Sequence, residues 1–168
     1  MKLSSVFSSV LNVLVLGSIA SVGVYQMKTA EATQYVKSVS AKDKACLQQN
    51  IFFEARNQST LGQESVAWVT LNRMNSSKYP NSICGVVWQS KQFSWTHDGL
   101  SDKPSSNILE QKAWEKAGHI AEKVLFKYAM DHKDPTNGAI MYHADYVKPY
   151  WKVAYNEVSK IDNHIFYK

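Results

Sequence analysis

Apolar residues recur at helical spacing over the first two thirds of the chain, and their pattern predicts two neighbouring helices. The first is expected from about Lys42 to Asn57, because one face of that stretch is apolar. Its apolar face consists of Ala45, Ile51, Phe52 and Ala55. The second is expected from Thr60 to about Asn75, since Thr60 and Gln63 have the spacing of a capping box. Its buried stripe consists of Val66, Ala67, Val69, Leu71 and Met74.

Turn-forming residues interrupt the helical pattern from Asn75 to Ser82, where we expect a loop. A short apolar element from Ile83 to Trp88 follows it. Helical spacing then returns after Asn107, which together with Glu110 forms another capping signature. The apolar positions of this third helix are Leu109, Ala113, Trp114, Ala117, Ile120, Ala121, Val124, Leu125 and Tyr128. They span about five turns, so we expect this to be the longest helix.

After Asp134-Pro135, short apolar runs replace the helical pattern. Residues 139–143 and 164–167 predict strands or extended segments. No internal repeat and no low-complexity linker divides this part of the chain. The pattern therefore predicts an α+β fold that is mostly α, built as one domain with a small β element.

The N-terminal segment predicts export. Residues 3–27 carry no charge, follow Lys2 and precede a small-x-small site that ends at Ala32. A secretory signal cleaved after Ala32 and an uncleaved or releasable membrane anchor both fit, because the run is long enough to span a bilayer but rich in serine and glycine. We therefore divide the chain into a signal or anchor segment, 1–32, and a catalytic domain, 33–168. We expect it in the periplasm or cell wall, with residues 3–27 holding it in the inner membrane if they are retained.

The composition of residues 33–168 indicates which kinds of partner the domain binds. Its formal net charge is +4 rather than the +5 of the whole chain, because Lys2, Lys28 and Glu31 are left behind. A modestly basic exported domain suits a polyanionic surface. No basic run with interleaved aromatic residues is present, so we expect no nucleic-acid partner. We also expect a monomer that needs no cofactor and no metal.

Two cysteines, Cys46 and Cys84, are the whole cysteine content of the chain. An even number of cysteines in an exported chain predicts one disulfide, which would tie the first helix to the segment after Pro80. The alternative is a pair of buried free thiols.

Glu54 is the residue whose surroundings best fit catalysis. It follows Ile51-Phe52-Phe53 and precedes Arg56, so packing of the helix removes water from its carboxylate and raises its pKa. A proton held near neutral pH is what general-acid cleavage of a glycosidic bond requires. A helix that presents such an acid to a cleft beside a small β element suits a lysozyme-like fold. The alternative is a helix acid paired with Arg56 or with a lysine from elsewhere.

Eight short motifs follow one another in order between residues 54 and 167. They are Glu54-Ala55-Arg56, Gly62-Gln63, Leu71-Asn72-Arg73, Tyr79-Pro80, Ile83-Cys84-Gly85-Val86-Val87, Gln92-Phe93-Ser94-Trp95, Tyr142-His143 and His164-Ile165-Phe166-Tyr167. This ordered set resembles the cell-wall hydrolase family of spore cortex-lytic enzymes and their phage and proteobacterial relatives. The resemblance implies a lysozyme-superfamily domain that cuts peptidoglycan between N-acetylmuramic acid and N-acetylglucosamine, usually as a lytic transglycosylase, with Glu54 as the acid. A phage endolysin, a germination enzyme and a wall-remodelling enzyme all remain open.

One departure from the family affects the expected mechanism. The family often has a second acid four residues after the first, where this chain has Gln58. Most glycosidases need two carboxylates. A lytic transglycosylase can work with one, because Glu54 can act first as acid and then as base to form a 1,6-anhydro product. A hydrolytic muramidase would need Asp98 or Glu64 as second acid, although Asp98 fits a turn residue and Glu64 an exposed acid in a first helical turn.

The resemblance also indicates residues that line the sugar cleft. They are Gln92, Phe93, Ser94, Trp95, Tyr142 and His143. Hydroxyls and amides orient sugars, Tyr142 would support an oxocarbenium-like state, and the flat face of Trp95 would stack on a sugar ring. Arg73 and His164 are interpreted as structural, with Arg73 anchoring a loop.

Other classes of wall protein were weighed on their sequence signals. A zinc amidase or peptidase would use His97, His119, His132, His143 or His164. No two of these histidines stand three to five residues apart, so the usual ligand spacing is missing. A noncatalytic wall-binding protein is a further alternative, which substitution of Glu54 would distinguish.

Overall fold

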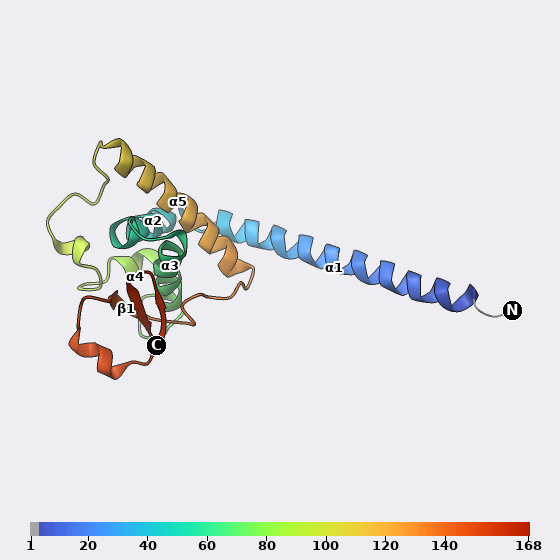
Figure 1. The fold of residues 1–168 in the computed structure, drawn as a ribbon. Coiled ribbons are helices and arrows are strands. Elements are labelled where there is room, and N and C mark those ends of the chain that lie inside the picture. Colours follow the sequence, from blue (N-terminus) through green and yellow to red (C-terminus); the bar gives the residue numbers. More distant parts are fainter. Residues whose placement is uncertain (1–3) are drawn as a thin grey trace.

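The structure, a computed structural model, describes the backbone of residues 4–168 and the side chains of residues 21–168. It is mostly helical with one small sheet, as the sequence predicts (Figure 1). The α-helices are α1 (Ser4–Ser38), α2 (Ala41–Ala55), α3 (Thr60–Met74), α4 (Ile83–Val87) and α5 (Ile108–Ala129). The 3-10 helices are η1 (Ser94–His97) and η2 (Tyr150–Ala154), and the strands are β1 (Met141–Ala144), β2 (Glu157–Ile161) and β3 (His164–Tyr167).

Polar side chains fix where the helices of the domain begin. Ser40 caps α2, Ser82 caps α4 and Asn107 caps α5, each by accepting a backbone N–H of the first turn. The predicted cap of α3 is wrong by one residue, because Ser59 rather than Thr60 accepts from Gly62. The amide of Gln63 instead donates to backbone carbonyls of the preceding loop, so it does not complete a capping box.

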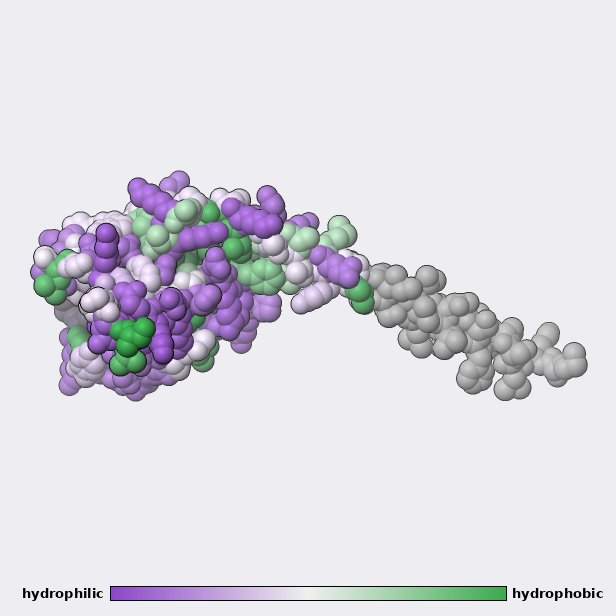
Figure 2. Space-filling model, turned by 90° about the horizontal axis from the view of Figure 1, so that it is seen from above, coloured by the Kyte–Doolittle hydropathy of each residue, from purple (hydrophilic) through white to green (hydrophobic). Residues whose placement is uncertain are grey.

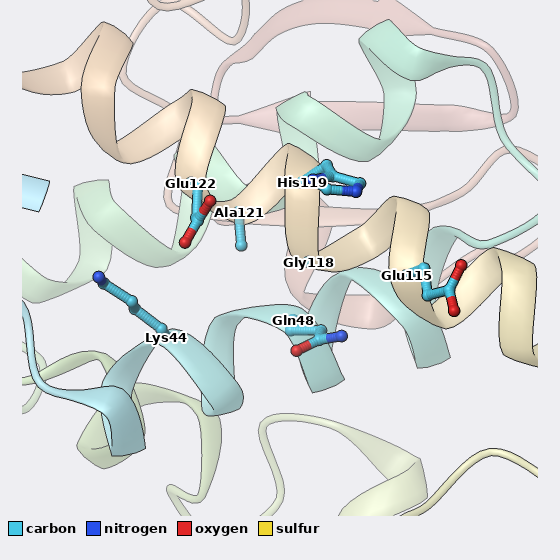
Figure 3. A pocket seen from close by; sticks show the side chains of 7 residues that line it. All are labelled: Lys44, Gln48, Glu115, Gly118, His119, Ala121 and Glu122. Carbon is cyan, nitrogen blue, oxygen red and sulfur yellow. The ribbon is translucent and has the colours of Figure 1, made fainter.

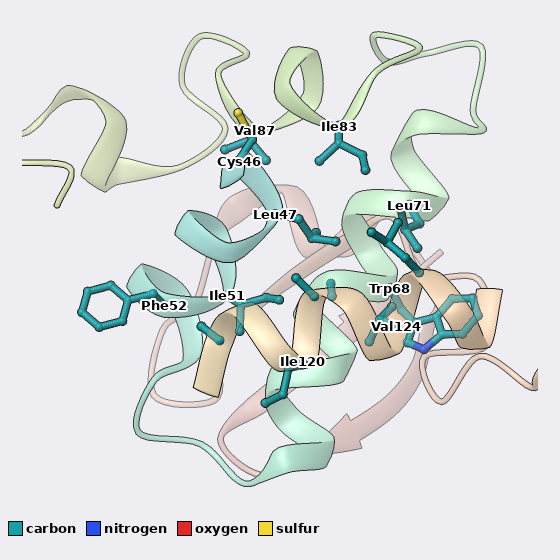
Figure 4. Packing of buried hydrophobic residues seen from close by; sticks show 14 of the residues in the cluster. Cys46, Leu47, Ile51, Phe52, Trp68, Leu71, Ile83, Val87, Ile120 and Val124 are labelled. Atoms are coloured by element: carbon teal, nitrogen blue, oxygen red, sulfur yellow. The ribbon is translucent and has the colours of Figure 1, made fainter. Parts of the chain in front are cut away.

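A single apolar core lies where helices α2, α3, α4 and α5 meet (Figure 4). Its labelled members are Cys46, Leu47, Ile51 and Phe52 from α2, Trp68 and Leu71 from α3, Ile83 and Val87 from α4, and Ile120 and Val124 from α5. Burial of an aliphatic or aromatic side chain of this size contributes about 1.5–3 kcal/mol. This core holds the C-terminal turn of α2, and therefore Glu54, in a fixed place.

The sheet has the strand order β1-β3-β2, and both pairings are antiparallel. Phe166 of β3 packs with Val69 and Ala139 in a second small apolar cluster, which joins the sheet to α3. The two predicted strands are present, with the first observed at Met141–Ala144. Sequence analysis missed β2, because its segment, Glu-Val-Ser-Lys-Ile, is an edge strand with a register shift and few buried positions.

Helix α1 crosses the expected domain boundary without a break. It extends away from the other elements at its N-terminal end, while its C-terminal end packs against α5 (Figure 1). Ala32 is buried, and Tyr35 and Val36 pack against the core, so helix α1 continues through the position expected for cleavage. The prediction that the third helix is the longest is wrong, since α1 has 35 residues and α5 has 22.

The predictions for residues 3–27 concern side chains that largely lie outside the described ones, which begin at residue 21. Within the described residues, no helix combines the length and the apolar character needed to cross a membrane. Figure 2 shows that the face of the domain seen from above is largely hydrophilic, with scattered hydrophobic side chains.

The predicted disulfide is present between Cys46 of α2 and Cys84 of α4. A second link joins the same two helices, because the backbone N–H of Cys84 donates to Asp43 at 2.9 Å. The short helix α4 is thus fastened to α2 by a covalent bond and a hydrogen bond.

Glu64 occupies a buried ion cluster rather than the exposed helix position expected from sequence. Its carboxylate pairs with Lys127 and, at 2.9 Å, with Lys123, and only 5% of its side chain is exposed. Burial raises the pKa of Glu64, but hydrogen bonds and the charges of the two lysines outweigh burial and lower it. The cluster therefore fastens α3 to α5.

Removing the disulfide is expected to destabilise the domain strongly. The variant C46S/C84S should lose about 3–4 kcal/mol of unfolding free energy, because the bridge closes a 38-residue separation in the unfolded chain. Urea denaturation of the variant and of oxidised wild type measures the loss. Reduced wild type should match the variant, and an unchanged denaturation midpoint after reduction would contradict the prediction.

The Glu64 cluster should make stability depend on acid pH. Since the pKa of Glu64 is lower when folded, its stabilisation is present above the unfolded pKa of about 4.3 and disappears as pH falls through the folded value. E64Q should cost about 1–2 kcal/mol at pH 7, a modest figure because both lysines are partly exposed. Urea denaturation at pH 7 and pH 3 tests this, with E115Q at an exposed α5 position as control. An equal cost at both pH values would argue against it.

Candidate active site

Glu54 lies in the last turn of α2, on the side that faces β1 and η1. The neighbouring residues Ile51, Phe52 and Ala55 are buried in the core, which fixes the helix. Glu54 itself is half-buried, so its carboxylate is shielded from water yet retains a route to a ligand. This is the environment that the apolar run before Glu54 predicts.

Tyr142 of β1 makes the one direct hydrogen bond to the Glu54 carboxylate among the described residues. Its hydroxyl donates to Oε2 of Glu54 over 2.9 Å. The Tyr142 ring is held by two residues of β3, because it packs edge to face on His164 at 5.3 Å and against Phe166 at 5.8 Å. The pairing of β1 with β3 therefore sets the position of the donor.

Burial is the largest influence on the pKa of Glu54 and raises it. The hydrogen bond from Tyr142, the charge of Arg73 and the Trp95 indole N–H each oppose that rise without cancelling it. Burial, reinforced by the Glu54 charge, places the pKa of Tyr142 well above its usual range, so Tyr142 stays protonated and able to donate. Glu54 is consequently a carboxyl group that keeps its proton to higher pH than an exposed glutamate does.

Arg73 of α3 anchors the segment before β1, as the sequence predicts. Its Nε donates to the backbone carbonyl of Ile140 at 2.7 Å, and its guanidinium lies over the rings of Tyr79 and Phe93, each at 5.4 Å. Sequence analysis missed its second property, which is an electrostatic influence on Glu54. No sequence signal indicates this influence, because α3 and the end of α2 come together only in the folded core.

Arg56 does not pair with Glu54, although it stands two residues away in the sequence. Its guanidinium lies over the Phe52 ring at 5.0 Å and 3.8 Å from a carboxylate oxygen of Glu110. The alternative interpretation of Glu54 as a member of a local ion pair is therefore wrong.

In the segment from Gln92 to Trp95, Trp95 is the residue that lies near Glu54. Trp95 is buried, its ring is stacked on Phe53 at 4.7 Å, and Phe93 and Trp88 also contact it. Because Trp95 is only 6% exposed and Phe53 stacks on its ring, little of that ring is open to a ligand, and its stacking on a sugar ring stays a prediction. The buried indole N–H makes no hydrogen bond of good geometry within the described residues, but it lies near enough to Glu54 to lower its pKa.

The remaining predicted cleft residues divide into two groups. Ser94 is exposed and Gln92 is partly exposed beside the buried residues of their motif, so both are accessible to a ligand, whereas Phe93 lies buried under Arg73. His143 points to the other face of β1 from Tyr142, because side chains alternate along a strand. Its ring contacts the Tyr167 hydroxyl at 3.0 Å and the Ala144 carbonyl at 2.8 Å, so it does not join the Glu54 cluster.

Neither rival carboxylate stands beside Glu54 in the described part of the chain. Glu64 is engaged by two lysines of α5, and Asp98 accepts the N–H of Leu100 at 2.9 Å in an exposed turn. Nor do the residues from 21 onward contain a group of three or more His, Cys, Asp or Glu side chains placed to hold a metal ion.

A separate cavity of about 280 Å³ lies between α2 and α5 (Figure 3). Lys44 and Gln48 from α2 face Glu115, His119 and Glu122 from α5 across it. Glu54, Tyr142 and Trp95 do not line this cavity, so it is distinct from the Glu54 cluster.

Comparison with known proteins gives consistent relatives. A spore cortex-lytic enzyme of Bacillus cereus is 27% identical over 139 residues, which are 82% of this chain and 49% of that protein, so the chain spans about half the length of this curated relative. The crystal structure of the catalytic domain of Bacillus cereus SleB superposes with a TM-score of 0.55 and 28% identity, covering 78% of this chain and 94% of that domain. The catalytic domain of a germination-specific lytic transglycosylase SleB from Bacillus anthracis gives a TM-score of 0.58 and 29% identity, covering 78% and 98%.

The fold of these domains is shared by this chain, which confirms the expected α+β, mostly helical, lysozyme-like architecture. The model of the Cell Wall Hydrolase family matches residues 57–167, from just after Glu54 to the end of β3. That range covers well over half of the chain and includes seven of the eight motifs. The chain therefore belongs to the cell wall hydrolase family.

Proposed function

We propose that this chain cleaves the peptidoglycan bond between N-acetylmuramic acid and N-acetylglucosamine as a lytic transglycosylase, with Glu54 as its acid and base. The observation that carries the proposal is a single half-buried carboxyl group with a raised pKa and a neutral donor, Tyr142, fixed on it. No second carboxylate among the described residues acts on that group. A relative that is named a lytic transglycosylase and shares the fold adds support.

In the first step, protonated Glu54 gives its proton to the glycosidic oxygen. The bond from the anomeric carbon to that oxygen then breaks, and its electron pair leaves with the oxygen. The muramic sugar is left with oxocarbenium character, and Glu54 is left as a carboxylate. The Tyr142 hydroxyl is placed to stabilise this carboxylate, because it already donates to Oε2.

In the second step, the 6-hydroxyl of the same sugar attacks the anomeric carbon. A new carbon–oxygen bond closes the 1,6-anhydro ring, and the hydroxyl proton passes to Glu54, which returns to its acid form. One residue therefore completes both transfers. Water must be kept from the anomeric carbon, and the stacked rings of buried Trp95 and partly buried Phe53 beside Glu54 serve that purpose.

Gln92 and Ser94 are proposed to hold the sugar chain. Both are accessible and lie in the same short segment as Trp95, whose indole reaches Glu54. An amide and a hydroxyl at such positions can hydrogen-bond sugar hydroxyl and acetamido groups.

The same proposal places the enzyme outside the cytoplasm. A disulfide between Cys46 and Cys84 persists in oxidising compartments, which agrees with an export segment in residues 1–32 and a wall substrate. We infer that the catalytic domain includes residues 33–168 together with the buried contact of Ala32.

Replacing Glu54 by glutamine should abolish wall cleavage while the fold survives. The amide keeps the shape of the carboxyl group but cannot deliver a proton, and general-acid catalysis is commonly worth about 10²- to 10⁴-fold. Turbidity loss of outer-membrane-permeabilised cells measures activity, with circular dichroism as the folding control. E115Q, the same change at an exposed α5 position, should retain wild-type activity. Activity of E54Q above about a hundredth of wild type would contradict the assignment.

The products should carry 1,6-anhydromuramic ends. Mass spectrometry of muropeptides from an initial-rate digest of purified peptidoglycan separates the outcomes, because a hydrolysed end contains one more water. Predominant hydrated ends would show a muramidase instead. In that case D98N should abolish activity, since Asp98, exposed in the turn after η1, is the first rival carboxylate that the sequence indicates.

A further inference from the structure

Arg73 carries a buried positive charge without a carboxylate in contact. Its side chain is 3% exposed, and no ion pair joins it to any acidic group among the described residues. Its Nε is satisfied by Ile140, Nη2 meets only the Met141 sulfur at 3.8 Å, and Nη1 has no partner within the part of the chain described. Removing a charge from water without compensation costs several kcal/mol, so this arrangement needs a reason.

Two aromatic rings compensate part of that cost but leave the charge available. The guanidinium lies 5.4 Å from the ring centres of both Tyr79 and Phe93, and such cation–π contacts strengthen when they are shielded from water. Anchoring the Ile140 carbonyl would need one neutral donor, not a full charge. This charge lies beside the proposed active centre, because Met141 precedes Tyr142 in β1 and the Phe93 ring packs on Trp95. It therefore acts on both Glu54 and Tyr142.

We propose that Arg73 is a positioning residue that acts through Glu54, by holding an uncompensated positive charge near the carboxylate that remains after Glu54 has protonated the leaving oxygen. This inference rests on the proposed function. A direct ion pair would bind the carboxylate too firmly for it to regain a proton from the 6-hydroxyl. A charge held near Glu54 but out of contact stabilises the carboxylate between the two steps and still lets it act as a base.

The inference predicts a shift of the alkaline limb of the pH–rate profile. Activity requires protonated Glu54, so the rate falls as pH rises through the pKa of Glu54. Arg73 lowers that pKa, and its removal in R73Q should therefore move the limb upward. We expect the limb to move upward by about 0.5–1 pH unit. An opposite charge in direct contact with a carboxyl group shifts its pKa by more, about 1–3 units. The maximal rate should fall as well, because Glu54 becomes a weaker acid.

The groups that contact Glu54 do not themselves produce this limb. Tyr142 of β1 has its pKa raised well above the ordinary value, and Trp95 of η1 is not ionisable. His164 of β3 packs on Tyr142, and burial lowers its pKa, which moves its titration away from the alkaline side. The comparison between variants assigns the limb, because Arg73 acts on Glu54.

The experiment compares R73Q, R73K and R56Q by initial rates on purified peptidoglycan between pH 4 and pH 9. R73K keeps the positive charge, so its limb should remain near wild type even if its rate falls. R56Q is the matched control, because Arg56 adjoins Glu54 in sequence but directs its guanidinium to Glu110 and the Phe52 ring. Its limb should not move. Thermal unfolding of each variant separates lost stability from a changed profile.

An unmoved or downward-shifted limb in a folded R73Q protein would overturn the inference, as would equal upward shifts in R73Q and R73K. If R73Q does not fold, R73K decides. A lysine keeps the positive charge but cannot reproduce the hydrogen bond from Nε to the Ile140 carbonyl. An alkaline limb of R73K within about 0.3 pH unit of wild type therefore supports the role of the charge. If neither variant folds, Arg73 is an anchor alone and the inference fails. Full activity of E54Q would refute the proposed function itself, which separates the two failures.

Discussion

The hydrogen bond from Tyr142 to Glu54 joins the helical half of the molecule to its sheet across 88 residues of sequence. For that bond to form, α2 must be held by the core and the disulfide, and β1 must be held by β3. Burial of apolar side chains and the disulfide stabilise the position of α2. Strand pairing and ring packing with β3 stabilise the position of β1. The site is precise because two independently stabilised parts meet at one carboxylate.

The proposed chemistry depends on a balance at that carboxylate. Burial alone would keep Glu54 protonated so firmly that it would be a poor proton donor, while an ion pair would keep it charged. The structure places a neutral hydroxyl in contact, an indole N–H nearby and a guanidinium out of contact, so that the pKa of Glu54 remains raised but moderated. One residue with such a pKa is able to give a proton and take one back, which is what a single-carboxylate mechanism demands.

Local signals in the sequence were sufficient for most elements of the fold. The apolar faces of α2, α3 and α5 and the cap of α5 depend on residues close together in the chain, so helical periodicity and a capping signature reveal them. Edge strand β2 escaped prediction, because its residues are mainly polar and its pairing with β3 is what orders it. The continuous α1 across residue 32 was also missed, since packing of Tyr35 and Val36 on the core decides where the domain begins.

The sequence by itself indicated Glu54 as the candidate acid and determined the disulfide and the class of fold, because an apolar run around a glutamate, a cysteine pair and an ordered series of motifs are all visible in one dimension. Tertiary structure alone decided which residues surround the acid. It brought Arg73 to Glu54, stacked Trp95 on Phe53, turned His143 to the opposite side of β1 and paired Glu64 with two lysines. The physical reason is that charge effects and burial depend on distances between elements, and those distances are set only when the helices pack on one another and on the sheet.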